Sequence, residues 1–313
     1  MEAELVPFDE SIPEWEQAFY AFLAEKERRS GSRRTVDAYS RTLQRFFGTL
    51  GKTPDQITER NVFTFAHGIG PSGRKPAAIT IGARLAAISS FYRFLIRMKI
   101  VTSNPCDQIE RPRVSPSPPR GLTAEEIRRL LAAIPDTMTG ARDRAIVIFL
   151  ALTGRRRSEV LNLKASDIIR AGGIFYTYRG KGGKKGKREL PRPALEAIER
   201  SLAAWGKSLD EMDARESIWP TAHVGRSARG LGVTDGTFYT NLRRYMKAAG
   251  LPPAGVHVLR HSAAKLRRDV GESIEDVSRF LDHSSLAVTT TYLRRLEGQR
   301  DEHWGEVAAS LGV

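Results

Sequence analysis

Hydrophobic side chains recur at intervals of three and four residues in four stretches of the first 110 residues, which predicts four amphipathic helices. A Ser-Gly-Ser break at 30–32 separates the first two helices, and Thr58 can cap the third. Residues 103–105, Ser-Asn-Pro, end the fourth, because a residue that precedes proline disfavours helical backbone. The first helix is expected over 11–29 and the fourth over 77–99. The second carries Tyr39, Leu43, Phe46 and Phe47, and the third starts after Thr58.

A proline-rich stretch divides the chain. Residues 111–120 contain four prolines and three arginines. Four prolines in ten residues cannot continue a helix and favour extended backbone. We therefore expect an all-α N-terminal domain over 1–110, a basic linker over 111–120 and a second domain over 121–313.

The second domain is predicted to combine helices with one short hairpin. Thr123 and Glu126 have the spacing of a capping box ahead of a helix. Residues 174–179, Ile-Phe-Tyr-Thr-Tyr-Arg, form the clearest strand, and 187–190 can pair back onto it. The predicted fold class is mainly α with two domains, the second being α+β with a small antiparallel hairpin. Further helices are expected near 139–153, 193–204, 235–249, 258–271, 274–281, 285–292 and 295–310, and 206–232 is expected to be irregular.

The charge of the chain indicates a polyanionic partner. The net charge is +14, and residues 111–313 account for +12 of it. Nucleic acid is the first expectation and an anionic membrane the second, although an arginine-rich composition alone would give the same charge. The single cysteine, Cys106, and the lack of a signal peptide or membrane span predict a cytoplasmic protein without internal disulfides.

Cleavage of a phosphodiester requires a nucleophile, cations that neutralise the phosphate oxygens, and an acid for the leaving oxygen. The sequence has no carboxylate cluster suited to Mg²⁺ and no zinc spacing, so we expect no metal and no cofactor. Arginine, lysine and histidine gather instead in four patches. These are Thr153-Gly-Arg-Arg-Arg-Ser-Glu159, Gly180-Lys-Gly-Gly-Lys-Lys185, His257-Val-Leu-Arg-His261, and Leu281-Asp-His283 with Tyr292 nine residues further on.

These patches resemble the tyrosine recombinase (phage integrase) family, nearest its Xer-like short-form members. The family pattern is Thr-Gly-x-Arg-x-Ser-Glu, a hairpin lysine in Gly-Lys-Gly, His-x-x-Arg, and Leu-Gly-His followed nine residues later by tyrosine. All four occur here in that order. The resemblance covers the second domain, and the helical first domain fits the SAM-like, four-helix core-binding domain. It implies the DNA breaking-rejoining enzyme fold for the second domain.

The resemblance implies a role for each matching residue. Arg156 and Arg260 would clamp the scissile phosphate, and Lys181 would protonate the 5′-oxygen, with Lys184 as the alternative. His257 and His283 would handle protons and hydrogen bonds. Tyr292 would be the nucleophile that forms a 3′-phosphotyrosine link, and Glu159, one helical turn after Arg156, would orient that arginine.

Three further groups of residues need separate interpretation. Asp282 stands where the family has glycine, and aspartate tolerates left-handed backbone less easily than glycine does. Four other tyrosines, Tyr176, Tyr178, Tyr239 and Tyr245, are interpreted as strand or core residues. Basic residues of the first domain could also contact phosphates, each being individually more typical of a plain surface charge: Arg33, Arg34, Arg41, Arg45, Arg74, Lys75 and Arg84.

The expected activity is site-specific recombination of double-stranded DNA through a Holliday junction, in integration, excision or dimer resolution. The resemblance implies a homo-tetramer on two DNA sites, with a second recombinase or an accessory protein as a further partner and no membrane contact. The amphipathic segment with Leu293, Leu296 and Trp304 could dock on a neighbouring protomer or on its own domain. The alternatives are a type IB topoisomerase, which only relaxes DNA, and an inactive DNA-binding architectural factor.

Overall fold

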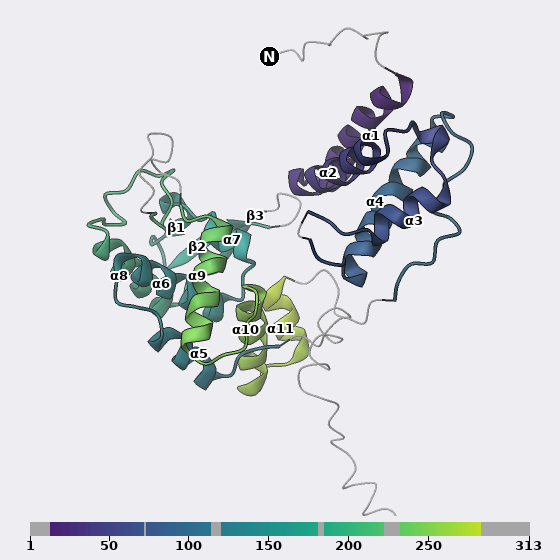
Figure 1. The fold of residues 1–313 in the computed structure, drawn as a ribbon. Coiled ribbons are helices and arrows are strands. Elements are labelled where there is room, and N and C mark those ends of the chain that lie inside the picture. Colours follow the sequence, from purple (N-terminus) through teal and green to yellow (C-terminus); the bar gives the residue numbers. More distant parts are fainter. Residues whose placement is uncertain (1–12, 72, 114–119, 181–184, 222–231, 283–313) are drawn as a thin grey trace, which may run out of the picture. The chain divides into compact units, whose positions relative to one another are not determined.

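The computed structural model describes residues 13–71, 73–113, 120–180, 185–221 and 232–282, and it divides the chain into two compact units, 1–116 and 117–313 (Figure 1). The division falls within the proline-rich stretch 111–120. Each unit has its own hydrophobic core and is described separately.

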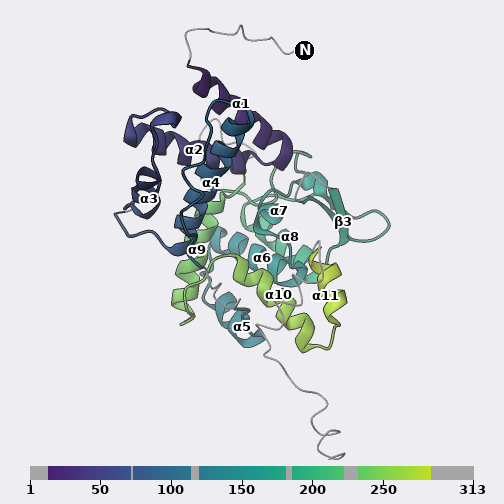
Figure 2. The same cartoon turned by 90° about the vertical axis from the view of Figure 1, so that its right-hand side faces the viewer.

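In the described part of the first unit, four helices surround one core (Figure 2). They are α1 (Glu14–Ser30), α2 (Arg33–Leu50), α3 (Glu59–His67) and α4 (Ala78–Arg97), with a 3₁₀ turn at Pro54–Gln56. Gly31 ends α1 in left-handed backbone (φ 57°), and the Ser32 hydroxyl accepts from Thr35 N at the start of α2. The four predicted helices are confirmed, and the two with predicted bounds, 11–29 and 77–99, correspond to α1 and α4 within a few residues at each end.

The central helix of this unit is α4, which packs against α1, α2 and α3. Its length and apolar composition would suffice to cross a membrane, but the apolar residues of its inner face fill the core of the unit instead, Leu85, Ile88 and Leu95 among them. Cys106 is a free, buried thiol beside the same core, and burial raises its pKa to about 12. The apolar character of α4 is therefore that of a core helix.

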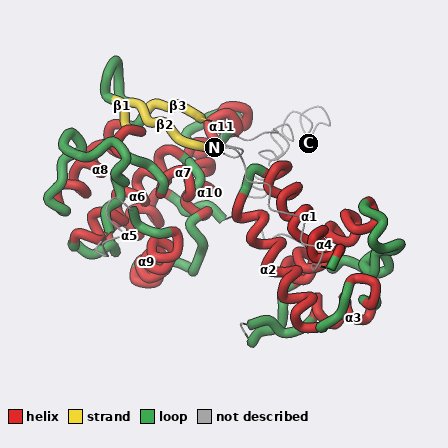
Figure 3. The backbone as a smooth tube through the Cα atoms, turned by 90° about the horizontal axis from the view of Figure 1, so that it is seen from above, coloured by secondary structure: helices red, strands yellow, loops and turns green. Residues whose placement is uncertain are grey.

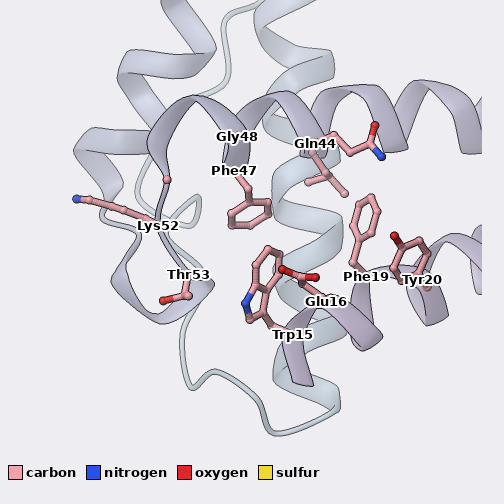
Figure 4. A pocket seen from close by; sticks show the side chains of 11 residues that line it. Trp15, Glu16, Phe19, Tyr20, Gln44, Phe47, Gly48, Lys52 and Thr53 are labelled. Atoms are coloured by element: carbon pink, nitrogen blue, oxygen red, sulfur yellow. The ribbon is translucent and has the colours of Figure 1, made fainter. Parts of the chain in front are cut away.

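A pocket of about 390 Å³ lies between α1 and α2 (Figure 4). Trp15 and Phe47 line it with their ring centroids 5.2 Å apart, and Phe19 and Tyr20 continue the aromatic wall. Tyr20 remains well exposed, so the wall is open to solvent.

Two basic residues of the first unit bind its own backbone. Arg84 donates to the carbonyl oxygens of Phe65 (3.1 Å), Ala66 (3.0 Å) and Gly68 (2.7 Å) at the end of α3. Arg45 donates to Ile69 O at 3.4 Å. The other basic residues named for phosphate contact are exposed: Arg33, Arg34, Arg41, Arg74 and Lys75.

The second unit is built around α6 (Met138–Thr153), which packs against α7, α8, α9 and α10 (Figure 3). Thr123 and Glu126 form the predicted capping box of α5 (Ala124–Ala132), with Glu126 N donating to Thr123 Oγ1 at 3.1 Å. The other helices are α7 (Arg157–Leu161), α8 (Arg192–Ala204), α9 (Asp235–Ala248), α10 (His257–Asp269) and α11 (Ile274–Leu281). The helices predicted at 285–292 and 295–310 lie outside the described residues.

A small antiparallel sheet with the order β1-β2-β3 completes the described part of this unit. Its strands are β1 (Ile168–Ile169), β2 (Phe175–Arg179) and β3 (Lys185–Glu189), with Tyr178 paired to Gly186. The predicted hairpin is confirmed, whereas the two-residue β1 was not predicted. Helix α11 lies beside β3 in both Figure 2 and Figure 3, and Figure 3 also shows β2 next to it.

The buried carboxylate of Asp143 connects α6 to α9 through hydrogen bonds from Asn241 and Tyr245. Asp143 is fully buried and accepts from the guanidinium of Arg142 (2.8 and 2.9 Å), from Asn241 (2.8 Å) and from Tyr245 (2.9 Å). Tyr176, Tyr178 and Tyr245 are buried as predicted. Tyr239 is exposed, so its interpretation as a core residue was wrong. The buried face of α9 carries Phe238, Leu242, Tyr245 and Met246, and this spacing turns residue 239 outward.

Candidate active site

The site begins at the tight turn between α6 and α7. Gly154 ends α6 with φ 60°, and its N–H donates to Leu150 O at 2.9 Å. A Cβ at this position would lie 2.6 Å from the ring of Phe280 and 2.8 Å from Leu281. Two features therefore require glycine at this position: the left-handed backbone and the close approach of α11. The turn places Arg155 beside the end of α11, where it contacts Phe280 and Asp282, and it leads directly into Arg156.

Arg156 is the N-cap residue of α7 and is held by Glu159. The Glu159 carboxylate accepts from the Arg156 backbone N at 3.0 Å and from its guanidinium at 2.8 Å. The Glu159 side chain is 2% exposed, whereas that of Arg156 is 34% exposed. The pairing expected from their spacing is present, and it leaves part of the guanidinium open to solvent.

Arg260 lies one turn into α10 and is 8% exposed. Its guanidinium donates to Gly154 O and to Leu281 O, each at 2.6 Å. Burial lowers the pKa of Arg260 to about 10, and the positive charges of Arg156 and Arg155 add to that effect. The group remains charged at neutral pH, and it bridges the α6–α7 turn to the end of α11.

His257 opens α10, as its position in the sequence predicts. Partial desolvation lowers the pKa of its imidazole, and the charges of Arg157, Arg260 and Arg156 lower it further. The ring is therefore mainly neutral at pH 7, a state in which it can accept a proton. Arg260 contacts the carbonyl of Gly154, two residues before Arg156, and His257 lies one turn before Arg260 on α10, so the three residues belong to one region.

Asp282 follows α11 in the left-handed conformation (φ 52°, ψ 45°), where the family pattern has glycine. Its carboxylate accepts hydrogen bonds from Arg155, Arg188 and the hydroxyl of Tyr178. Burial alone would raise the pKa of Asp282, but the hydrogen bond from Tyr178 and the two arginines outweigh it and hold the pKa at about 2. The aspartate adopts the glycine-like backbone. Apart from this departure from the family pattern, nothing in the sequence indicates the network.

Carboxylates in this region are paired with arginines. Across the described ranges, no three His, Cys, Asp or Glu side chains gather as metal ligands do. Glu159 contacts Arg156, Asp235 contacts Arg157, and Asp282 contacts Arg155. The arrangement suits an anionic ligand, because its arginines are numerous and are already oriented.

Family models match most of the chain. The phage integrase family matches residues 120–298, which is more than half of the chain, and the phage integrase N-terminal SAM-like domain matches residues 17–99. The chain belongs to the phage integrase family. The family resemblance inferred from the four patches is thereby confirmed, as is the fold class of a helical first domain followed by a mainly helical domain with a small sheet.

Curated phage integrase relatives similar to this chain are named tyrosine recombinases. Tyrosine recombinase XerC of Myxococcus xanthus is 34% identical over 212 residues, covering 67% of this chain and 69% of the relative. Tyrosine recombinase XerD of Halalkalibacterium halodurans is 28% identical over 275 residues, covering 86% of this chain and 89% of the relative. The similarity to Xer recombinases therefore extends across both units.

Solved structures share the fold. A lambda integrase dimer bound to a COC′ core site superposes with a TM-score of 0.66 at 18% identity, covering 92% of this chain and 79% of that one. The XerH site-specific recombinase bound to a palindromic difH substrate, in its post-cleavage complex, superposes with a TM-score of 0.64 at 21% identity, covering 95% and 84%. At these identities the likeness establishes the common fold.

Three of the predicted site residues of this phage integrase family member lie outside the described residues. Lys181, with its alternative Lys184, belongs to the segment between β2 and β3, and His283 and Tyr292 follow α11. The flanking elements are described, with Arg179 paired to Lys185 across the hairpin. The structure thus brings together Arg156, His257 and Arg260, and the roles of all six residues remain predictions.

A second basic feature lies on α9. Arg243, Arg244 and Lys247 line a pocket of about 510 Å³ together with the exposed Tyr239. The guanidinium of Arg243 lies 5.9 Å from the Tyr239 ring centroid. Sequence periodicity marked α9 as a helix but gave no reason to single out this basic face. Clustered cations beside an aromatic ring suit a phosphate backbone.

Proposed function

We propose that this chain is a site-specific DNA recombinase that cuts and rejoins DNA through a 3′-phosphotyrosine intermediate on Tyr292. The observation that carries the proposal is the convergence of Arg156, Arg260 and His257 in a member of the phage integrase family. Guanidinium groups offer planar forks that can bind two phosphate oxygens at once, and they stay charged. Arg156 held by Glu159 and Arg260 held by two carbonyls would meet the charge that develops on those oxygens.

The proposed reaction has two balanced steps. The Tyr292 oxygen attacks the phosphorus and gives its proton to a histidine, while the bond to the 5′-oxygen breaks and Lys181 protonates that oxygen. His257 and His283 are the proposed proton-handling pair, and Lys184 is the alternative acid. A free 5′-hydroxyl then attacks the phosphotyrosine and gives its proton to Lys181, while the bond to Tyr292 breaks and the histidine returns a proton to the tyrosine oxygen. The link conserves the bond energy, so rejoining requires neither ATP nor a metal.

The proposed partner is double-stranded DNA. Its binding is supported by the net charge of +14, the basic face of α9 and the exposed arginines of the first unit. We assign DNA binding to the helical domain over 1–110 and catalysis to the domain over 121–313, with residues 111–120 as the basic linker between them. We expect the enzyme to act in the cytoplasm.

The proposed active assembly is a homo-tetramer on two DNA sites that exchanges strands through a Holliday junction. One solved structure of the same fold is a lambda integrase tetramer bound to a Holliday junction, with a TM-score of 0.63. We propose that the segment after residue 296 contacts a neighbouring protomer. Truncation after residue 296 should weaken assembly on DNA, and unchanged assembly would contradict this role. A second recombinase or an accessory protein remains a proposed partner.

The test of the mechanism is a nicked suicide substrate, on which cleavage traps the covalent adduct. The wild type should form the adduct, and Tyr292→Phe should not. The absence of an adduct with the wild type, or its formation by the Phe variant, would overturn the mechanism. The curated relatives and solved structures compared above are recombinases and integrases, which favours recombination over topoisomerase activity. A plasmid with two target sites separates the two activities, because only a recombinase gives deletion or inversion.

A further inference from the structure

The two carbonyl oxygens that hold Arg260 belong to backbone segments that a second interaction joins. Arg260 donates to Gly154 O and Leu281 O, each at 2.6 Å. The residue after Gly154 is Arg155, the residue after Leu281 is Asp282, and these two side chains form an ion pair. The Arg155–Asp282 ion pair therefore joins the same two backbone segments that Arg260 joins, one residue further along each segment.

Both oxygens of the Asp282 carboxylate are engaged. Oδ2 accepts from Arg155 and from the Tyr178 hydroxyl, and Oδ1 accepts from Arg188. Tyr178 lies on β2 and Arg188 on β3, so both strands of the hairpin attach to the end of α11. Arg188 strengthens this attachment by donating to Arg279 O at 2.9 Å. The carboxylate is thus the common acceptor for the hairpin and the α6–α7 turn.

The Asp282 carboxylate neutralises the charge of the buried Arg155 guanidinium. The Arg155 side chain is 1% exposed and lies over the ring of Tyr178, with the guanidinium carbon 4.8 Å from the centroid. Its other hydrogen-bond acceptors among the described residues are neutral: the hydroxyl of Tyr178 and the backbone oxygens of Thr153 and Phe280. A buried guanidinium without a nearby carboxylate is unfavourable. Loss of the Asp282 charge would therefore disturb the turn that carries Arg156.

We propose that Asp282 is a positioning residue for DNA cleavage, whose carboxylate locks the end of α11 to the α6–α7 turn and so sets the places of the Arg260 and Arg156 guanidiniums. The proposal rests on the proposed function, which assigns phosphate binding to these two arginines. In the family pattern this position is glycine, which satisfies the left-handed backbone without contributing a charge. This chain meets the same backbone requirement with a residue that also ties three elements together.

The first test replaces Asp282 by asparagine, which adopts left-handed backbone but has no charge. The measurements are the single-turnover rate of adduct formation at saturating nicked DNA, the Kd for that DNA, and the Tm, with rates taken well below the Tm of each variant. The expected result is a rate about tenfold lower with Kd unchanged within about twofold. The matched control is Asp276→Asn on the same helix, whose exposed pair with Arg279 spans 2.6 Å. It should leave rate and Kd at wild-type values.

The second test separates charge from backbone strain. Asp282→Gly restores the family residue and removes the strain but leaves Arg155 without its carboxylate, so its cleavage should stay slow. Adding Arg155→Met removes the buried guanidinium that has lost its carboxylate. The double variant should therefore cleave at least about threefold faster than Asp282→Gly.

Two results would overturn the proposal. One is a wild-type cleavage rate for fully folded Asp282→Asn or Asp282→Gly, and the other is a double variant no faster than Asp282→Gly. A wild type that forms no adduct would contradict the proposed function instead, so the two failures are distinguishable.

Discussion

Replacing Glu159 by glutamine tests whether this carboxylate prepares Arg156 to bind a phosphate. Glutamine keeps an oxygen that can accept from the Arg156 backbone N–H, but it cannot keep the ion pair with the guanidinium at 2.8 Å. A hydrogen bond to a charged group contributes about 1.5–3 kcal/mol. If that free energy is expressed in the transition state, it corresponds to roughly 10- to 150-fold in rate. Because Arg156 is one-third exposed and water can partly replace the lost partner, we expect the lower end, about tenfold.

The assay is the single-turnover rate of adduct formation at saturating DNA, measured together with the Tm. Glu159→Ala removes the backbone acceptor as well, so it should lower the free energy of unfolding by about a further 1 kcal/mol through loss of the helix cap. The matched control is Glu125→Gln, which breaks the exposed pair of Glu125 with Arg128 at 2.7 Å and should change neither quantity. A wild-type rate for fully folded Glu159→Gln would refute the reasoning and leave Glu159 as a helix cap alone.

Three further predictions concern stability and pH. Asp143→Asn removes the charge of a fully buried carboxylate that accepts from an arginine, an asparagine and a tyrosine. The free energy of unfolding should fall by about 3–5 kcal/mol, which lowers the Tm by roughly 6–20 °C. A Tm decrease below about 2 °C would contradict this prediction. Gly154→Ala should destabilise more than Gly250→Ala in thermal unfolding, because both have positive φ (60° and 66°) but only the first would place a Cβ 2.6 Å from Phe280. The pKa of His257 is lowered from 6.5 in the folded state, so the unfolded chain binds this proton more tightly; the resulting stability is present above pH 6.5 and is lost as the pH falls through the folded value. His257→Gln should flatten that part of the pH dependence of unfolding, and an unchanged slope would contradict the assignment.

Much of the fold follows from the sequence because its signals are local. Residues such as Phe22, Leu43 and Leu85 recur at helical spacing and are buried where that spacing places them. Thr58 and Thr123 mark helix starts through hydrogen bonds that span three residues. The strand β2 was predictable because aromatic and β-branched residues lie between two glycines.

The network around Asp282 could not be predicted, because its partners are far apart in the chain. Tyr178, Arg188 and Arg155 precede Asp282 by 104, 94 and 127 residues. Nothing in the local pattern connects a strand tyrosine to a residue after a helix end. The sequence showed only that an acid occupies a glycine position, which suggested backbone strain and not a ligand for two arginines. Long-range hydrogen bonds between side chains need the folded chain before they can be identified.

The run of three arginines shows how local backbone geometry assigns different tasks to adjacent identical residues. Taken alone, the run is typical of a solvated basic face, but the left-handed turn at Gly154 and the extended N-cap conformation at Arg156 direct the three side chains apart. Each reaches a different acid: Arg155 contacts Asp282, Arg156 contacts Glu159, and Arg157 contacts Asp235 at 2.8 Å. The arginines are therefore ordered before any phosphate arrives. An arriving phosphate would meet a guanidinium already in place, so little reorganisation is needed as charge develops in the transition state.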